Sequence, residues 1–485
     1  MSETYPTLTR SLVNKPVKTE KIIQFGTGAF LKGFINDIFQ QLNDQGLYDG
    51  GLVAVKLRPG NARQIEQINR QDGLFTLNVR GVDNGKLVDH YRVIDVQNRA
   101  LSPYDDLDGF MALADNPELE WIVSNTTEAG ICFDEQQQFS DAPALGFPAK
   151  LTQLLYRRYQ TFNGDSGKGV TVLCCELIEN NAQVLLGYLK QYAQLWQLDT
   201  EFEHWLSQHC YFHNTLVDRI VTGRPPEPRM AEITQAVNYL DAELIETESY
   251  YQWVIETNGR AEVLSKLFAK SAGLNVILTD DLTSYRQRKV RILNGAHTGC
   301  VALAQLLDIE TVYQATQTPI IKQFLQRLVF DEIVPTINQP QAEVTAYAQA
   351  IIERFENPFL FHAWQSIALN SISKWSARLL PTLQDGVADR GKPSTGIATS
   401  LAALLLLYGA QPKTPAQGPQ DAPEIITKFQ AAFQTQPVES FVVQILADKT
   451  LWGQDLTAIP GLAETVTEIV GRLQQQGVET YLQLL

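Results

Sequence analysis

Cysteine is scarce in this sequence, and the few that occur form no disulfide or ligand pattern. The chain has 5 cysteines among 485 residues, and no two have the C-x-x-C spacing. An odd, scattered set is typical of reduced thiols in a cytoplasmic protein and argues against a disulfide framework. His204, His209 and His213 lie close together, but without cysteine or carboxylate neighbours in a familiar order for zinc. We therefore expect a cytoplasmic protein that binds no metal.

Positive charge and long apolar runs are also in short supply. Lysine and arginine number 39 against 54 aspartates and glutamates, which gives a net charge of −15 without any basic block. This balance argues against nucleic-acid or anionic-membrane partners. The most apolar run, residues 397–408, has about a dozen residues, too few to span a bilayer. The N-terminus is polar and lacks an apolar signal core. The expected partner is therefore a small molecule, and the sequence does not indicate an oligomeric state.

The first part of the chain alternates short apolar strands with helical patterns. Strands are expected at residues 21–25, 51–56, 75–80, 86–93, 121–124 and 169–174, and helices at 31–47 and 107–114. Such alternation predicts a parallel α/β sheet with some antiparallel insertion. After about residue 285 helical periodicity dominates. We expect an α/β domain over residues 1–284 and a mostly α-helical domain over 285–485, with a cleft between them.

A glycine turn follows the first expected strand. Gly26-Thr27-Gly28 comes directly after residues 21–25, and a helical pattern begins with Ala29 and Phe30. Strand, glycine turn and helix form the context of a dinucleotide loop. There, Gly26 would allow the tight turn and Gly28 would let backbone amides approach a pyrophosphate. The third glycine of the usual fingerprint is displaced by two places, so a plain strand-to-helix turn is the alternative.

Two further strand ends bear on a dinucleotide. An acidic residue commonly follows the second strand of NAD-binding domains, but Arg58 stands near that place here. It would meet a 2′-phosphate, cover an adenine, or lie in solvent, so the choice between NAD and NADP stays open. Asn125 and Thr126 follow the strand at 121–124, where a nicotinamide or ribose would rest. A helix cap is the alternative interpretation of that turn.

Lys289, Asn294 and His297 bring an amine, an amide and an imidazole together in what reads as one helix. At about 100° per residue, Asn294 lies about 140° and His297 about 80° from Lys289, so all three can border one cleft. Lysine can transfer a proton, an amide can polarise a carbonyl, and histidine can orient either one. This set suits redox chemistry at a carbinol carbon. A solvated lysine beside a core histidine is the alternative.

The K-x4-N-x2-H pattern of these residues resembles the active-site signature of the mannitol dehydrogenase family, the polyol-specific long-chain dehydrogenases. Further matching segments extend the resemblance over nearly the whole chain: residues 22–26, 124–130, 175–178, 215–223, 288–297, 354–358 and 455–461. The resemblance implies a Rossmann-like N-terminal domain, a mostly α-helical C-terminal domain and an active site between them. It also implies metal-independent hydride transfer with NAD, with NADP remaining possible.

The resemblance also assigns roles to residues. It implies that Lys289 is the general acid/base, that Asn294 and Asn181 polarise the reacting oxygen, and that His297 orients the substrate. Asp218 and Lys374 are expected to line the substrate pocket. The reaction expected is reduction of D-tagaturonate to D-altronate, and the carboxylate of the substrate would need a cation. The candidates are Lys374, Arg378 and Arg219. A surface ion pair is the alternative for each of them and the favoured interpretation for the two arginines. Alternatives for the whole chain are a fructuronate or fructose substrate, or a non-catalytic dinucleotide sensor.

Overall fold

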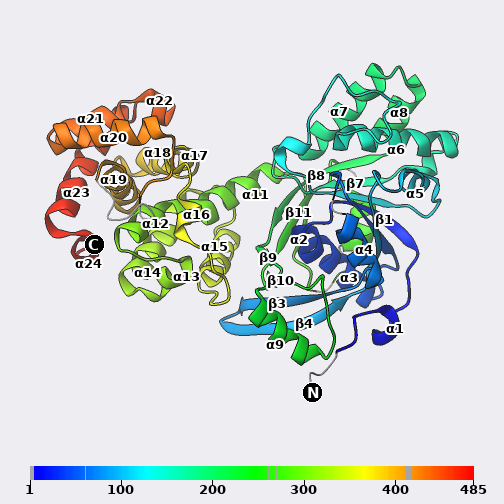
Figure 1. The fold of residues 1–485 in the computed structure, drawn as a ribbon. Coiled ribbons are helices and arrows are strands. Elements are labelled where there is room, and N and C mark those ends of the chain that lie inside the picture. The colour runs from blue at the N-terminus through cyan, green and yellow to red at the C-terminus, as the bar shows by residue number, and fades with distance from the viewer. Residues whose placement is uncertain (1–4, 61, 260, 269–270, 272, 411–417) are drawn as a thin grey trace. The chain divides into compact units, whose positions relative to one another are not determined.

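The computed structural model describes residues 5–485 except 61, 260, 269–270, 272 and 411–417. The chain consists of two compact units (Figure 1). The first unit comprises Met1–Arg80 and Leu87–Leu282, and the second comprises Gly81–Lys86 and Thr283–Leu485. Each unit is described by itself below.

The first unit is built on a mixed sheet. Among the described residues its strands are ordered β12-β11-β8-β7-β6-β1-β2-β5. From β5 to β8 all neighbours are parallel, whereas β11 runs antiparallel to β8. The strand order reverses at β1, which lies between β2 and β6, and ligands of open α/β sheets bind beyond the strand ends at such a switch point. The strands are β1 (Glu20–Phe25), β2 (Gly51–Val55), β5 (Gln97–Leu101), β6 (Trp121–Ser124), β7 (Thr171–Cys174), β8 (Tyr211–Asp218), β11 (Gln252–Glu256) and β12 (Val276–Thr279).

Helices cover both faces of this sheet, which is why its central strands are continuous apolar runs. Alternate residues of one strand belong to different cores: Ile22 packs on one face and Ile23 on the other. One core includes α3 (Asp37–Asp44), and the other includes α6 (Phe147–Thr161) and α7 (Asn181–Leu195). The other helices of this unit are α1 (Arg10–Val13), α2 (Ala29–Leu31), α4 (Ala62–Arg70), α5 (Leu107–Ala112), α8 (Thr200–Gln208), α9 (Glu227–Val237) and α10 (Ala261–Phe268).

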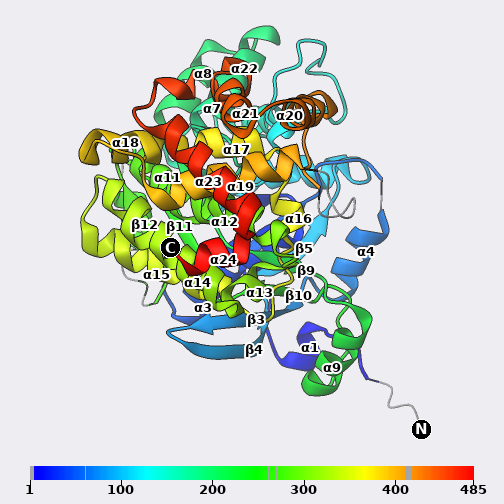
Figure 2. The same cartoon turned by 90° about the vertical axis from the view of Figure 1, so that its left-hand side faces the viewer.

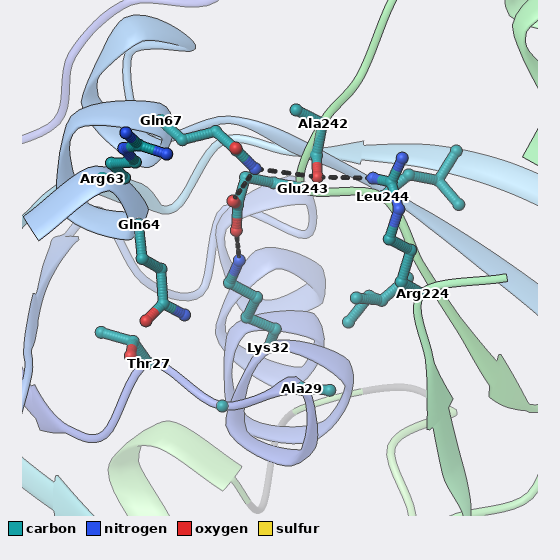
Figure 3. Close-up of a pocket in the computed structure, with 12 residues that line it drawn as sticks. Thr27, Ala29, Lys32, Arg63, Gln64, Gln67, Arg224, Ala242, Glu243 and Leu244 are labelled. Carbon is teal, nitrogen blue, oxygen red and sulfur yellow. Dashed lines mark hydrogen bonds and ion pairs between the residues drawn. The ribbon is translucent and has the colours of Figure 1, made fainter. Parts of the chain in front are cut away.

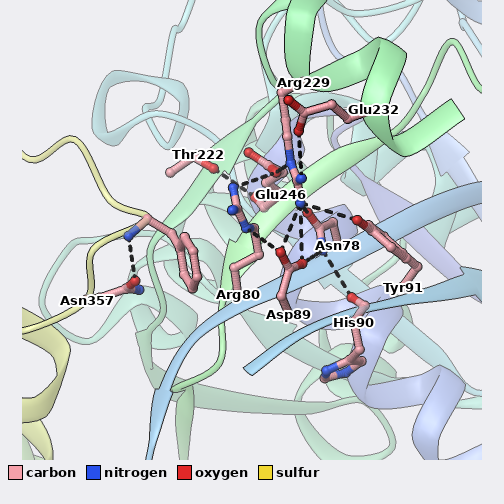
Figure 4. A network of polar contacts seen from close by, with 11 residues as sticks. Asn78, Arg80, Asp89, His90, Tyr91, Thr222, Arg229, Glu232, Glu246 and Asn357 are labelled. Atoms are coloured by element: carbon pink, nitrogen blue, oxygen red, sulfur yellow. Dashed lines mark hydrogen bonds and ion pairs between the residues drawn. The ribbon is translucent and has the colours of Figure 1, made fainter. Parts of the chain in front are cut away.

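The expected antiparallel insertion belongs to a separate small sheet ordered β4-β3-β10-β9 within the described chain. Its strands are β3 (Phe75–Asp83), β4 (Lys86–Ile94), β9 (Val221–Gly223) and β10 (Ile245–Glu248). Arg229 of α9 reaches across this sheet and forms ion pairs with Asp89 at 3.1 Å and Glu246 at 3.3 Å (Figure 4). Arg80 contacts the same two carboxylates. The ion pairs between these two arginines and two carboxylates thus connect α9 to β3, β4 and β10.

All the expected strands are confirmed, with bounds that differ by at most a few residues. The sequence did not predict β5 or β8–β12. The helix expected at 31–47 is not a uniform α-helix. It consists of α2, a π-helical turn over Lys32–Asn36, and α3. The helix expected at 107–114 is α5 followed by a 3₁₀ turn at Leu113–Asp115.

The second unit is helical throughout its described part beyond residue 283, as expected. The apolar run 397–408 lies in α19 (Thr395–Gly409), which is almost wholly buried and packs against α12 (Gly295–Leu306), α20 (Pro423–Thr435) and α23 (Leu462–Gln476) (Figures 1 and 2). No described helix combines the length and apolarity that crossing a bilayer requires. The remaining helices are α11 (Leu282–Lys289), α13 (Val312–Gln317), α14 (Pro319–Gln326), α15 (Gln341–Phe355), α16 (Trp364–Ile367), α17 (Ser371–Arg378), α18 (Leu380–Arg390), α21 (Val438–Leu446), α22 (Lys449–Trp452) and α24 (Val478–Gln483), with π turns at Val290–Asn294 and Arg327–Ile333.

A buried ion pair joins the two sheets of the first unit. Arg219, directly after β8, donates from Nη1 to Asp37 Oδ2 on α3 at 2.6 Å, and the side chains are 1% and 0% exposed. Arg92 of β4 lies 2.9 Å from the other oxygen of the same carboxylate. The interpretation of Arg219 as a surface ion pair was therefore wrong: it is paired, but in the interior.

Removing Asp37 leaves Arg219 charged and buried without its counter-ion. Because breaking one partner of a buried pair typically costs about 3–5 kcal/mol, we expect Asp37→Ala to lower the free energy of unfolding in urea by this amount. Asp49→Ala is the matched control: Asp49 pairs with Lys18 but is 86% exposed, so its loss should cost under about 1 kcal/mol. Equal losses in both variants would contradict the structural role of Asp37.

Candidate active site

The glycine turn after β1 has a separate role for each glycine. Gly26 has φ of +130°, and a Cβ there would lie 2.8 Å from Leu31 Cδ1, so both backbone and packing require glycine. Gly28 is the N-cap of α2 with φ of −74°, and a Cβ there would meet no protein atom within 4 Å. A Cβ on Gly33 would lie 2.9 Å from Val221 of β9, so the displaced third glycine allows close packing. The space beside Gly28 is left open for a ligand.

A cavity of about 640 Å³ begins at this turn, a size that suits a cofactor. Its wall comes from the loops after β1, β2 and β6 and from the segment that leads into α6. The residues that the sequence predicted as cofactor-binding and that line it are Gly26, Thr27, Gly28, Arg58, Asn125 and Thr126. Ala29 lines the neighbouring cavity, and Phe30 instead stacks on Phe34 with ring centroids 5.1 Å apart.

The sequence analysis missed one whole wall of this cavity. Cys132, Asp134, Gln137, Leu145, Gly146 and Phe147 line it from a long irregular segment before α6. No periodicity marks such a segment in the sequence. In the structure, the apolar side chain of Leu145 is 67% exposed on this wall. An exposed apolar side chain on a cavity wall suits the face of an aromatic base.

A buried carboxylate fixes the polar turn after β6. Glu176, in the loop after β7, accepts a hydrogen bond from the Thr126 backbone N–H at 2.9 Å and another from Ser124 Oγ at 3.1 Å. Burial raises the pKa of the Glu176 carboxyl. Asn125 donates from Nδ2 to the Cys175 carbonyl at 2.6 Å. The two loops are therefore tied together, and the predicted nicotinamide end of the cavity has a fixed wall.

A second cavity of about 370 Å³ adjoins the same glycine turn and contains several cations (Figure 3). Lys32 points from the first π turn to Glu243, with which it forms a buried ion pair. Gln67 donates to the other oxygen of Glu243 at 2.6 Å. Arg63 and Arg224 also line this cavity. Glu243 neutralises Lys32, so the positive charge that favours the phosphates of a dinucleotide near the glycine turn comes from arginines such as Arg63 and Arg58.

The helix that carries Lys289 is not one uniform α-helix. It consists of α11, a π turn over Val290–Asn294, and α12. The Gly295 backbone N–H bonds to the Val290 carbonyl, five residues back. This widened turn reduces the angle between Lys289 and Asn294 below the roughly 140° expected for α-helical geometry. The angular prediction is thus corrected, and the correction brings the amine and the amide nearer to one side.

His297 lies in a buried aromatic setting within the second unit. Its ring stacks on Phe355 at 4.3 Å and contacts His362 at 5.0 Å and Trp364 at 6.1 Å between centroids. Nε2 has no hydrogen-bond partner among the described residues. Burial, followed by nearby positive charge, holds the pKa of His297 well below its usual range. The imidazole is therefore neutral at pH 7, and its buried Nε2 makes no hydrogen bond to a described residue.

The remaining predicted site residues are distributed over both units. Lys289, Asn294 and Lys374 belong to the second unit and are half-buried. In the first unit, Asp218 ends β8 and is 6% exposed. Asn181, at the start of α7, is fully buried, and its Nδ2 donates to the carbonyls of Cys174, Glu176 and Thr215 at 2.9–3.1 Å. Its contact with the reacting oxygen stays a prediction, and one that would require exchanging one of these bonds.

Comparison with known proteins places both units in one family. Residues 20–266 match the model of the mannitol dehydrogenase Rossmann domain, and residues 281–474 match that of the mannitol dehydrogenase C-terminal domain. An altronate oxidoreductase of Bacteroides thetaiotaomicron is 38% identical over 97% of this chain and 98% of its own length. One of Bacillus subtilis is 37% identical over 96% of this chain and 95% of its own length.

Solved structures show the same fold. A substrate-free D-sorbitol dehydrogenase has a TM-score of 0.79 at 20% identity and covers 98% of this chain and all of its own. A mannitol 2-dehydrogenase of Pseudomonas fluorescens, in a ternary complex with NAD and D-mannitol, has a TM-score of 0.64 at 22% identity and covers 96% of this chain and 94% of its own.

A methyl group at Gly28 tests where the pyrophosphate binds. Gly28→Ala places its Cβ in open space, so we expect urea unfolding to change by under about 0.5 kcal/mol. A bound dinucleotide would meet that methyl group, so the Kd for NADH, measured by fluorescence titration, should rise about tenfold or more. Gly26→Ala is the comparison, because the positive φ and the Leu31 contact should destabilise the fold itself by about 1 kcal/mol or more. An unchanged Kd in Gly28→Ala would remove the pyrophosphate from this turn.

Proposed function

The chain belongs to the mannitol dehydrogenase family, and from this premise we propose that it is an NAD-dependent reductase that converts D-tagaturonate into D-altronate. The observation that carries the substrate assignment is the full-length similarity to relatives named altronate oxidoreductase. Lys289, Asn294 and His297 also retain the family signature, which a dinucleotide sensor would not need. The reaction is reversible, so the same site oxidises D-altronate.

The choice of NAD rests on the family resemblance. Bound NADH supplies the hydride to the substrate's ketone carbon. The glycine turn and its 640 Å³ cavity have the size and backbone amides that a dinucleotide needs. Arg58 stands where a 2′-phosphate would bind, so NADPH is the natural comparison in any assay.

In the proposed mechanism Lys289 moves the proton. During reduction its ammonium donates a proton from Nζ to the substrate oxygen as negative charge develops there. During oxidation the neutral amine takes the hydroxyl proton. Asn294, brought nearer to Lys289 by the π turn, donates an amide hydrogen bond to the same oxygen. Donors of this kind typically contribute about 2.7–4 kcal/mol to lowering the barrier.

Asn181 and His297 have supporting parts in this mechanism. The bonds of Asn181 to three backbone carbonyls favour a role in holding the strand ends around the site, with Asn294 as the principal donor. His297 is neutral and buried, so it orients a substrate hydroxyl through Nε2 without adding charge. Asp218 is assigned to substrate hydroxyls, because its carboxylate would repel the substrate's own.

Substrate preference is the direct test of the assignment. We expect oxidation of NADH with D-tagaturonate at a kcat/KM at least about tenfold above that with D-fructuronate or D-fructose, a difference of about 1.4 kcal/mol. Absorbance at the nicotinamide band measures all three rates, and NADPH is run in parallel. A preference for fructuronate or fructose would transfer the assignment to a sibling activity. NADH binding without turnover of any ketose would favour a sensor.

The acid/base role is tested by Lys289→Ala. Because general acid–base catalysis typically contributes about 10²–10⁴-fold, we expect kcat to fall by at least about 10² while NADH still binds in a fluorescence titration. Lys322→Ala, which removes a lysine paired with Glu356 on the surface of the same unit, should retain the wild-type rate. A Lys289→Ala enzyme with near wild-type turnover would end the proposed mechanism.

A further inference from the structure

Helix α17 presents two cations one turn apart. Lys374 and Arg378 stand at i and i+4, where side chains on a helix are neighbours, and like charges at this spacing disfavour the helix. Both are half-buried, and burial lowers the pKa of each. Each contacts only a neutral acceptor within the described chain: Lys374 donates from Nζ to the Ile367 carbonyl at 2.9 Å, and Arg378 from Nη1 to Thr298 Oγ1 at 3.1 Å.

The chain has many carboxylates, and other cations of the same unit form ion pairs with them. Arg291 pairs with Asp385 at 2.5 Å, and Lys322 pairs with Glu356 at 2.7 Å. Asp421 is the acidic residue whose charge reaches Lys374, but no ion pair within 4.0 Å joins them in the described structure. That carboxylate instead accepts a hydrogen bond from Tyr408 Oη at 2.9 Å. Two adjacent, only half-buried cations without a close counter-ion, in a protein of net charge −15, are therefore open to an external anion.

The two cations lie beside His297. Thr298, which accepts the bond from Arg378, is the next residue after His297. Lys374 is bonded to the end of α16, and Trp364 at the start of α16 packs on the His297 ring. Burial lowers the pKa of His297 most, and His362, Arg354, Arg378 and Lys374 lower it further in that order. The ring of His297 and the two cations of α17 therefore share one electrostatic environment.

Two buried polar atoms at the same place also have no partner. His297 Nε2 and Trp364 Nε1 make no hydrogen bond to any described residue, although the two residues are only 7% and 2% exposed. Buried polar groups are normally satisfied. Two cations and two unsatisfied ring nitrogens therefore belong to one connected group of side chains within the second unit.

We propose that Lys374 and Arg378 form the subsite that binds the carboxylate of the substrate, beside the neutral ring of His297. The inference rests on the proposed reductase function and names the feature that selects an acid sugar over a neutral one. Arg219, the third candidate cation, is already neutralised by Asp37 in the interior of the first unit. A guanidinium and an ammonium offer the charge-assisted hydrogen bonds that a carboxylate prefers.

A matched pair of ligands isolates the carboxylate. D-altronate and D-altritol differ in a carboxylate against a hydroxymethyl group at one end, so their ratio of dissociation constants reports the subsite alone. With NADH bound to prevent turnover, calorimetry on the wild-type protein should give a Kd for altronate at least about tenfold below that for altritol. Lys374→Met and Arg378→Met keep the apolar stem but lose the charge. In each variant the Kd for altritol divided by the Kd for altronate should fall by about tenfold, while the Kd for altritol itself changes by less than about threefold.

Three controls make the result decisive. Lys322→Met, a charge loss elsewhere in the same unit, should keep the wild-type ratio, and Arg378→Lys should restore most of what Arg378→Met loses. A wild-type protein that binds altronate no better than altritol overturns the subsite, whatever its reductase activity. So does an unchanged ratio in both methionine variants, or an equal loss of both ligands. Conversely, selective binding of altronate without turnover of D-tagaturonate would support the subsite and refute the proposed function.

Discussion

The candidate cofactor site depends on hydrogen bonds that tie the carboxyl ends of parallel strands to one another. Glu176 holds the turn after β6 through Thr126 and Ser124, and Asn181 joins the end of β7 to the middle of β8 through backbone carbonyls. Without the bonds of Glu176, the turn after β6, which lines the cavity, would not be held to the loop after β7. Desolvated polar groups are costly when unpaired, so this network also stabilises a single arrangement of the strand ends. The position of the cavity wall follows from a few buried side chains.

Charge is distributed differently in the second unit. In the first unit Asp37 neutralises the buried Arg219, whereas α17 keeps Lys374 and Arg378 without a close carboxylate among the described residues. The adjacent His297 remains uncharged chiefly because burial lowers its pKa, and the two cations lower it further. A neutral imidazole beside two cations can bind an anionic sugar without adding a third positive charge to the free protein. The local field also opposes the negative field of the whole chain, which would otherwise repel such a ligand.

Sequence reasoning succeeded where burial imposes a simple pattern. Strands β1, β2 and β6 are buried on both faces and read as apolar runs, and the Lys289 signature is fixed in spacing. Strand β8 was missed because His213, Asn214 and Thr215 are polar, and their side-chain hydrogen bonds allow them to be buried. The cavity wall over residues 132–147 has no period to detect. The sequence could not predict the surroundings of Lys374 and Arg378 either, because only the three-dimensional structure shows whether a cation has a nearby counter-ion.

Both helices that bear on the chemistry, the one after the glycine turn and the one with Lys289, contain a π turn. Such a turn accommodates one residue more than an α-helix of the same length. The direction in which each later residue of the helix points therefore depends on the number of residues in the turn as well as on their identity. Shortening the Lys289 segment by a single residue would rotate His297 by roughly 100° about the helix axis, although no functional side chain had been altered. Natural variation in this family should accordingly tolerate exchanges within these two segments far better than changes in their length.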